Sequence, residues 1–324
     1  MLVLGIESSA HTFGVGVVGA GRVMSNEKAM FPISDKGLIP SKVAETHVKN
    51  APTVVQAALD AAGVRLSEVE GIGYTRGPGL GPCLQVGELT AKSLAQKLAV
   101  PIAQVNHGVA HIEVTRLLTK MRDPLALYVS GGNSQILKAT AEPFRHYAIL
   151  GETFDIGVGN MFDNFARGIG LNPAWGSTVG KMASGGNYVK LPYTVKGMDF
   201  AFTGLLTNAI KLAATERKED LCYSIQETAF SMLCEATERA MFLTKSTELC
   251  VCGGVAQSRR LKEMLKSIAN EHRIKFGACA DEYNADNGAM IAVVAERMLK
   301  KGMGSMVSEC GIEQRYRVDR AVIV

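Results

Sequence analysis

The sequence contains no apolar run that reaches the roughly 18 residues needed for a membrane-spanning helix. Its first residues, MLVLGIESSA, place no basic residue ahead of the apolar stretch, so no targeting leader is expected. Seven cysteines are an odd number spread over 324 residues, which argues against a disulfide framework and favours a reducing compartment. We therefore expect a soluble cytoplasmic protein with no membrane partner.

The sequence also lacks a dense basic face of the kind that binds nucleic acid. Its net charge is +4, from 35 basic and 31 acidic residues, and the basic residues occur in scattered spots that are typical of solvated helix surfaces. None of the glycine-bearing turns that end the predicted strands matches the dinucleotide-binding fingerprint or the lysine-bearing phosphate loop. Composition alone therefore identifies no partner.

What is present is enough apolar material for two cores, with 47% hydrophobic and 20% charged residues. The opening LVLGIESSAHTFGVGVVG and the later LALYVSGGNSQILKA share one design, in which a strand, a small polar turn and a second strand follow each other. Helical patterns alternate with further strands after each hairpin. We predict an α/β protein of two duplicated subdomains with a cleft between them, divided as residues 1–124 and 125–299, with residues 300–324 as a candidate return to the first.

The segment NHGVAHIE places His107 and His111 four residues apart, a spacing that puts both imidazoles on one face of a helix. A proline-led apolar strand precedes the segment and an apolar helical face follows it, so we predict a helix that begins at the histidines. The spacing alone leaves a metal site and a simply packed pair both open. A metalloprotease is excluded, because Gly108 occupies the place of its general base.

Glycine-bearing turns end four predicted strands, at residues 7–14, 77–82, 130–133 and 253–256. Each turn could simply reverse the chain, but free backbone N–H groups at such turns also form phosphate cradles. Their order matches the actin, chaperone and sugar-kinase class of nucleotide-binding folds. We expect the paired hairpins to face the phosphates.

Two further residues are candidate metal ligands. Tyr128 lies on the strand before SGGN, where it could equally be a half-buried strand aromatic, and Asp286 starts the helix DNGAMIA, where it could be a helix cap. Together with the two histidines they would form a set suited to iron or zinc.

A series of motifs, taken in order, resembles the universal tRNA threonylcarbamoyladenosine transferases over essentially the whole chain, and most closely the catalytic subunit of the archaeal and eukaryotic KEOPS complex. The motifs are GIESSAHT, RGPGLGP, VNHGVAHIE, YVSGGNSQ, GETFDIGVGN, FDNFAR, LPYTVKGMDFAFTGLLT, SIQETAF, GGVA and DNGAMIA. The chain departs from the family pattern at PAWGS, which replaces a PGGP turn, at Gly180, where an acidic residue is common, and at Gln257 and Ser258, which replace an asparagine pair.

The resemblance implies an actin-like fold of two ribonuclease-H-like subdomains. It implies transfer of the threonylcarbamoyl group from threonylcarbamoyl-AMP to the exocyclic amine of the adenosine 3′ of the anticodon, in tRNAs that read codons beginning with A, with release of AMP. It also implies one transition metal ion per subunit, iron or else zinc, with His107 and His111 as the catalytic residues. The implied metal ligands are His107, His111, Tyr128 and Asp286, and the implied adenine-nucleotide positions are Tyr128, Val129, Ser130, Gly131, Gly132, Asp163, Gly176, Gly180 and Ser258.

The partners implied by the resemblance are tRNA and the other KEOPS subunits, namely a small protein kinase or ATPase, a small dimerising subunit and a further small subunit. Two alternatives remain at this stage. An ATPase or phosphotransferase of the same fold would use a carboxylate near the phosphates, for which Glu7 is the obvious candidate at the hairpin tip. A noncatalytic scaffold would keep the fold without the chemistry, and the intact histidine pair argues against it.

Overall fold

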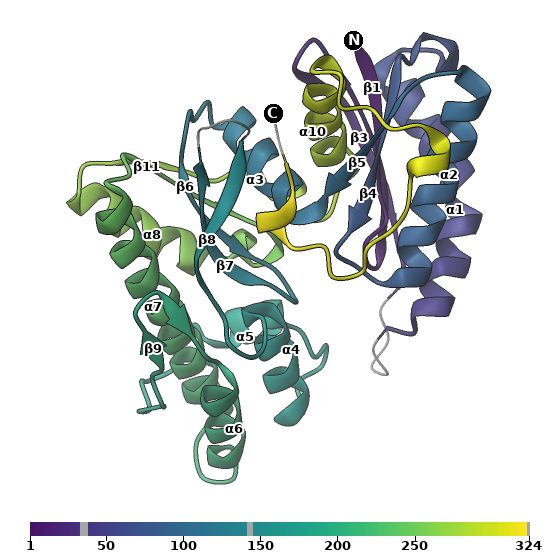
Figure 1. Ribbon diagram of the computed structural model, residues 1–324. Helices are drawn as coiled ribbons and strands as arrows, with labels where there is room; N and C mark the ends of the chain where they lie inside the picture. The colour runs from purple at the N-terminus through teal and green to yellow at the C-terminus, as the bar shows by residue number, and fades with distance from the viewer. Residues whose placement is uncertain (33–37, 141–144, 323–324) are drawn as a thin grey trace. The chain divides into compact units, whose positions relative to one another are not determined.

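A computed structural model describes residues 1–32, 38–140 and 145–322 (Figure 1). The chain forms two compact units, each with its own mixed sheet. Unit 1 comprises Met1–Leu117, Thr140–Tyr147 and Ala285–Val324, and unit 2 comprises Leu118–Ala139 and Ala148–Asn284. Among the described residues, no helix combines the length and the apolar character needed to cross a membrane.

Unit 1 is built on a five-stranded sheet with the order β3-β2-β1-β4-β5, in which β1 pairs antiparallel with β2 and parallel with β4. The strands are β1 (Leu2–Glu7), β2 (Thr12–Gly19), β3 (Arg22–Met30), β4 (Gly71–Gly77) and β5 (Ile102–Asn106). The helices are α1 (Pro40–Ala62), α2 (Gly81–Leu98), α3 (His107–Leu118) and α10 (Gly288–Lys300). The predicted opening hairpin is confirmed, and so is the helix that begins at His107.

Alternation of valine and glycine in β2 determines how this sheet is covered. Side chains alternate between the two faces of a strand, so Val15 and Val17 enter a core with residues of α1 and α2. Gly14 and Gly16 present backbone to the opposite face, where α10 packs so closely that a Cβ on Gly16 would lie 2.3 Å from the Ala289 nitrogen. Figure 1 shows α10 on one side of the sheet and the two long helices on the other.

Unit 2 has a second five-stranded sheet with the order β12-β11-β6-β7-β8, in which β6 pairs antiparallel with β7 and parallel with β11. The strands are β6 (Leu125–Val129), β7 (Ser134–Thr140), β8 (His146–Glu152), β11 (Glu248–Cys252) and β12 (Lys275–Gly277), with a separate pair β9 (Val195–Lys196) and β10 (Asp199–Phe200). The helices are α4 (Val158–Gly168), α5 (Gly176–Met182), α6 (Thr203–Leu212), α7 (Lys218–Thr244), α8 (Arg259–Glu271) and α9 (Asp281–Asn284). The second predicted hairpin, β6 to β7, is confirmed.

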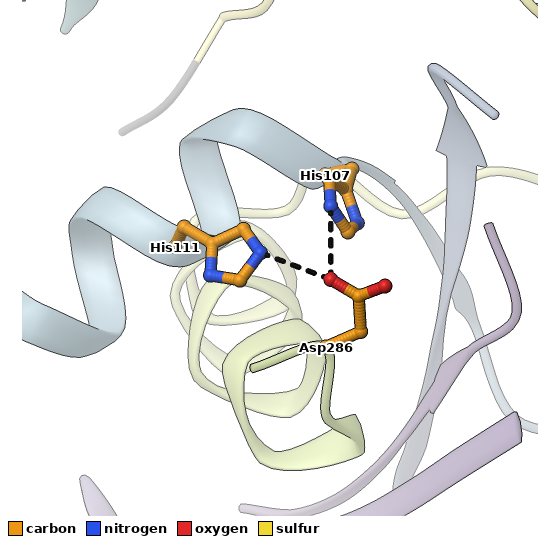
Figure 2. Close-up of side chains that lie close together, drawn as sticks. All are labelled: His107, His111 and Asp286. Carbon is orange, nitrogen blue, oxygen red and sulfur yellow. Dashed lines mark ion pairs between the residues drawn. The ribbon is translucent and has the colours of Figure 1, made fainter. Parts of the chain in front are cut away.

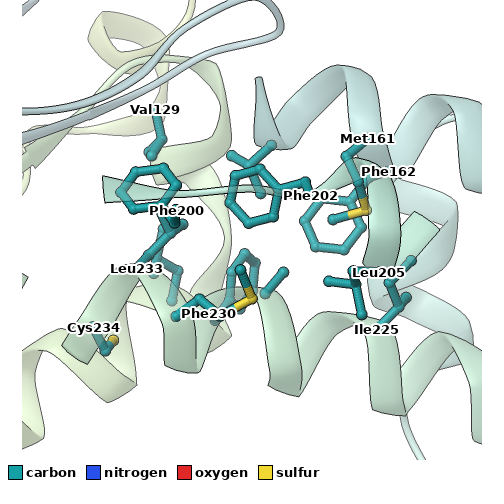
Figure 3. Packing of buried hydrophobic residues seen from close by; sticks show 14 of the residues in the cluster. Val129, Met161, Phe162, Phe200, Phe202, Leu205, Ile225, Phe230, Leu233 and Cys234 are labelled. Atoms are coloured by element: carbon teal, nitrogen blue, oxygen red, sulfur yellow. The ribbon is translucent and has the colours of Figure 1, made fainter. Parts of the chain in front are cut away.

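The core of unit 2 is rich in phenylalanine and is centred on α7 (Figure 3). The rings of Phe162 on α4 and Phe230 on α7 meet edge to face, with centroids 5.5 Å apart. Phe200 and Phe202 are fully buried beside them. This core holds the turns after β6 and β11, which belong to the same parallel pair of strands.

The division of the chain differs from the one expected from sequence. Residues 285–299 were expected in the second subdomain, but α10 packs against β1, β2 and β4, and the segment belongs to unit 1. The glycine-lined sheet face provides the physical reason, because only a helix without bulky side chains at the contact fits against it. Residues 300–322 also belong to unit 1, as the sequence indicated, and residues 323–324 lie outside the described part.

Candidate metal centre and nucleotide turns

Strand β5 and the first turns of α3 position the two histidines. The Asn106 side chain accepts a hydrogen bond from the Val109 N–H at 3.1 Å and so caps the helix at the end of the strand. His107 and His111 are buried, and their rings meet edge to face with centroids 4.7 Å apart. One helical turn thus brings both imidazoles to one point, as the four-residue spacing predicted.

Asp286 comes from the other side of unit 1, directly before α10. The helix cap is the neighbouring Asn287, whose side chain accepts a hydrogen bond from the Met290 N–H at 2.9 Å. Asp286 is therefore not the cap, and its Oδ1 lies 3.5 Å from His107 Nε2 and 3.4 Å from His111 Nε2 (Figure 2). Segments about 180 residues apart in sequence thus meet at one carboxylate.

A second carboxylate, Glu7 at the end of β1, supports this group from behind. It is fully buried, and its Oε2 lies 3.0 Å from His107 Nδ1. The Thr75 hydroxyl and the Ser9 backbone N–H each donate to Glu7 at 2.6 Å, which fixes the carboxylate. Because Glu7 engages Nδ1, the Nε2 atom of His107 faces Asp286. A carboxylate behind a ligating histidine is a common arrangement in metal sites.

The charges of these groups leave the site net negative. Burial alone would lower the pKa of His107, but the Glu7 carboxylate raises it to about 9. Burial lowers the pKa of His111, so this imidazole is neutral. Burial opposes ionisation of Glu7 and Asp286, yet the adjacent histidines hold the pKa of both carboxyls below their usual range. Two carboxylates therefore face one imidazolium, which favours a cation.

The donor set fits a transition metal. One donor atom from each of His107, His111 and Asp286 lies within 4.8 Å of the others, and across the described ranges no other such group of His, Cys, Asp and Glu gathers this closely. Ligands about 2.1 Å from one ion lie roughly 3 to 3.5 Å apart, which agrees with the two separations between Asp286 Oδ1 and the histidine nitrogens. Two imidazoles and one carboxylate suit iron or zinc, and such a triad with open positions is characteristic of non-haem iron.

The remaining predicted site residues all lie in unit 2. Tyr128 is buried on β6, and its membership of the ligand set stays a prediction. Val129 ends β6, and the Ser130 hydroxyl accepts a hydrogen bond from the Asn133 N–H at 3.1 Å in the turn that follows. Gly131 is contacted there by the start of α4, because the Asn160 N–H donates to its carbonyl at 3.0 Å.

The glycine turns after β6 and β11 lie side by side. Gly253 has φ +94°, and a Cβ there would lie 2.4 Å from the Val129 carbonyl oxygen. Gly132 has open space around its Cα, with nothing within 4 Å of an added Cβ among the described residues. These neighbouring turns at the ends of adjacent parallel strands offer backbone N–H groups of the kind that bind phosphate.

Of the other nucleotide positions, Asp163 and Gly176 are brought together, since the Gly176 N–H donates to Asp163 Oδ1 at 2.7 Å. Gly180 follows on α5, where a Cβ would lie 3.3 Å from Gln226 Oε1. Ser258 caps α8, its hydroxyl accepting from the Leu261 N–H at 3.4 Å. A nucleotide role for any of these residues stays a prediction.

Sequence reasoning missed Glu7 as the support of His107. It noted Glu7 only as a carboxylate at the hairpin tip. The missing information was the strand order, in which β1 neighbours β4 and β4 neighbours β5, so that the ends of β1 and β5 lie close together.

Comparison with known families places the whole chain beside named relatives. The family model described as tRNA N6-adenosine threonylcarbamoyltransferase matches residues 21–293. A protein of that name from Thermococcus sibiricus is 44% identical over 322 residues, which cover 98% of each chain. A probable bifunctional tRNA threonylcarbamoyladenosine biosynthesis protein from Methanothermobacter thermautotrophicus is 46% identical over 323 residues. The match covers 98% of this chain but only 60% of that relative's length.

Solved structures with low sequence identity share the fold. HypF from T. kodakarensis aligns with a TM-score of 0.65 at 15% identity, covering 93% of this chain and 48% of that one. The activator of 2-hydroxyisocaproyl-CoA dehydratase from Clostridium difficile aligns with a TM-score of 0.54 at 11% identity, covering 93% and 97%. The predicted actin-like α/β fold is confirmed. With the family match spanning most of its length and near-complete alignment to curated relatives, this chain belongs to the tRNA N6-adenosine threonylcarbamoyltransferase family.

Proposed function

We propose that the protein transfers the threonylcarbamoyl group from threonylcarbamoyl-AMP to the exocyclic amine of the adenosine 3′ of the anticodon, in tRNAs reading codons that begin with A. The observation that carries the proposal is the buried group of His107, His111 and Asp286, supported by Glu7, in a chain of this family. In this reaction a bond forms between the adenine amine nitrogen and the carbamoyl carbon. The bond from that carbon to the phosphate oxygen breaks, AMP leaves, and the amine loses a proton.

His107, His111 and Asp286 would hold an iron or zinc ion in unit 1. Such an ion supplies Lewis acidity for a carbonyl oxygen. His107, which is an imidazolium in the absence of a metal, would release its Nε2 proton on binding one. Glu7 holds the His107 ring with Nε2 directed towards Asp286, and burial keeps His111 neutral, the form that can ligate a metal.

In unit 2, the backbone amides of the turns at 130–132 and 253–254 would hold the leaving phosphate. Hydrogen bonds to a departing phosphate stabilise the charge that develops on it. The substrate is already activated as a phosphate-linked carbamoyl group, so the reaction requires no covalent protein intermediate. Asp163 would contact nucleotide hydroxyls rather than act as a base.

The ATPase or phosphotransferase alternative loses its candidate carboxylate. Glu7 is already engaged by His107, Ser9 and Thr75 and is fully buried. The scaffold alternative does not explain why two histidines and two carboxylates are kept together inside unit 1. No specific observation favours either alternative.

The proposed partners are tRNA and the other subunits of a KEOPS complex, namely a small kinase or ATPase, a small dimerising subunit and a further small subunit, acting in the cytoplasm. Support comes from the similarity to a relative whose name calls it bifunctional. In such an assembly several subunits would share the tRNA.

The test is a transfer assay with purified protein, threonylcarbamoyl-AMP and unmodified tRNA, with the modified adenosine measured by mass spectrometry. His107→Ala and Asp286→Ala should abolish product formation while the fold is retained. His272→Ala, a half-buried histidine on the other unit that pairs with Glu238, is the control and should be active. Full activity in His107→Ala or Asp286→Ala would refute the role of this group, and absence of product with the unaltered protein, assayed together with the proposed partner subunits, would refute the proposed function.

A further inference from the structure

In unit 2 an irregular segment, residues 187–197, lies along helix α7. We call it the strap. Figure 1 shows β9, near the end of the strap, beside α7. The strap and the helix run in the same direction, because the contacts begin with Asn187 at Asp220 and end with Gly197 at Arg239. The contacts are Asn187 N–H to Asp220 Oδ1 at 2.7 Å, Val189 N–H to Ser224 Oγ at 2.7 Å, Tyr188 Oη to Thr228 Oγ1 at 3.4 Å, Tyr193 O–H to Glu235, and Arg239 Nη1–H to the Gly197 carbonyl at 2.7 Å.

Two tyrosines of the strap are held at the hydroxyl yet exposed at the ring. Tyr188 is 56% exposed and Tyr193 is 48% exposed. Between them Leu191 is 5% exposed and anchors the strap in the core. The hydroxyl contacts restrict the rings, so further contact costs little additional side-chain entropy. The contacted α7 residues are seven apart, which places the hydroxyls about 10 Å apart along the helix.

The chain around the strap is basic. Residues 164–198 contain four basic residues and no Asp or Glu, a local charge of +4, which equals the net charge of the whole protein. The four are Arg167, Lys181, Lys190 and Lys196, and the three lysines are exposed. The remaining 289 residues are therefore neutral in sum (324 − 35). This basic segment carries the exposed tyrosines and is bounded by Asp163 and by Asp199, which lies opposite Lys196 in the β9–β10 pair.

Several acidic residues of α7 are already engaged by groups other than the strap lysines. Asp220 and Glu235 accept hydrogen bonds from the strap, and Glu235 also pairs with Arg239. Glu219 lies 3.8 Å from Arg217. These carboxylates are used in attaching the strap to the helix or in pairing with arginine.

From these observations we infer that the strap is a docking surface for unpaired nucleotides of an RNA, with bases stacking on Tyr188 and Tyr193 and phosphates meeting Lys190 and Lys196. Exposed aromatic rings interleaved with basic residues are the features with which proteins bind single-stranded nucleic acid. The inference rests on the proposed function, which supplies a tRNA substrate with an unpaired loop. An acidic protein would use the lysines but would not require the rings.

The test measures binding of a fluorescent anticodon stem-loop RNA to the full chain by anisotropy, without threonylcarbamoyl-AMP. Tyr188→Ala and Tyr193→Ala should each raise Kd about tenfold, because each removes one stacking platform. Tyr188→Phe and Tyr193→Phe keep the ring and should retain most of the affinity. Lys190→Ala should weaken binding and reduce the slope of log Kd against log salt by about 0.7, the value for one phosphate contact on a single strand.

Phe242→Ala is the matched control, since Phe242 is also on unit 2 and is 61% exposed. It should bind RNA as the unaltered protein does. The inference is overturned if the unaltered protein does not bind the RNA, or if both tyrosine-to-alanine variants bind it as tightly as the unaltered protein does. It is also overturned if an acidic peptide displaces the RNA equally from these variants and from the unaltered protein. Modification of tRNA by the unaltered protein, measured separately, shows whether the proposed function stands when the strap inference fails.

Discussion

Replacement of Gly16 by alanine should disturb the proposed metal centre by displacing the start of α10. A Cβ at this position would lie 2.3 Å from the Ala289 nitrogen and 2.7 Å from the Gly288 carbonyl carbon, both backbone atoms of α10. Ordinary contact begins at 3.4 Å, so the start of α10 must move by about 1 Å (3.4 − 2.3). Asp286 lies two residues before Gly288 and moves with it. Metal ligands tolerate only about 0.2 Å.

We therefore expect two measurable effects of Gly16→Ala. Overpacking against backbone should cost about 1 to 3 kcal/mol, which lowers the melting temperature by roughly 2 to 12 °C. Metal affinity, measured by competition with a chromophoric chelator, should fall by about tenfold or more, the scale seen when ligand orientation is disturbed.

Gly204→Ala provides the matched control for this experiment. Gly204 lies in the first turn of α6, and among the described residues nothing lies within 4 Å of an added Cβ. The same substitution there should leave metal affinity unchanged and stabilise the protein by up to about 1 kcal/mol, because alanine favours a helix. If Gly16→Ala binds metal as the unaltered protein does, the glycine-lined face does not set the position of Asp286.

Three further predictions concern single side chains. Glu7→Gln should weaken metal binding about 10- to 100-fold, because it removes the carboxylate that orients His107; unchanged affinity in the same competition titration would contradict that role. Glu113→Ala should cost about 3 to 5 kcal/mol in urea unfolding, because this fully buried carboxylate pairs with three arginines that would then repel one another; a loss below 1 kcal/mol would show that the arginines find other partners. Asp155→Asn should lower stability at neutral pH, because Asp155 accepts from two N–H groups at the start of α6 and its pKa is depressed by hydrogen bonds that outweigh burial. That contribution is present above the ordinary value of 3.8 and is lost as the pH falls through the lower folded pKa, so the two melting curves should converge in acid.

The local patterns of the sequence predicted the elements that carry the site. The four-residue spacing of His107 and His111 indicated one helical face, and the paired strand-turn-strand segments indicated two hairpins. These inferences succeeded because helix and strand periods are properties of neighbouring residues. The sequence offered Asp286 only as one candidate partner of the histidines, because its position depends on how α10 packs across the sheet.

Features that depend on strand order or on long-range packing were not predictable. From sequence, the alternating glycines of β2 could be assigned only to a turn or a strand. The fold shows that Gly14 and Gly16 allow α10 to pack closely against the sheet of unit 1. For Asp286 the sequence left both a metal ligand and a helix cap open, and only the fold shows that Asn287 is the cap. The strap carries no regular period, since its position follows from side chains of α7 that bond to its backbone at irregular intervals.

The most direct test of the account is the metal content of the purified protein and of His111→Ala, determined by mass spectrometry on samples prepared without chelators. The account predicts one transition metal ion per chain in the unaltered protein and none in the variant, because the substitution removes one of the three donors that gather at the proposed centre. Equal metal content in the two proteins would contradict the claim that His107, His111 and Asp286 form the centre.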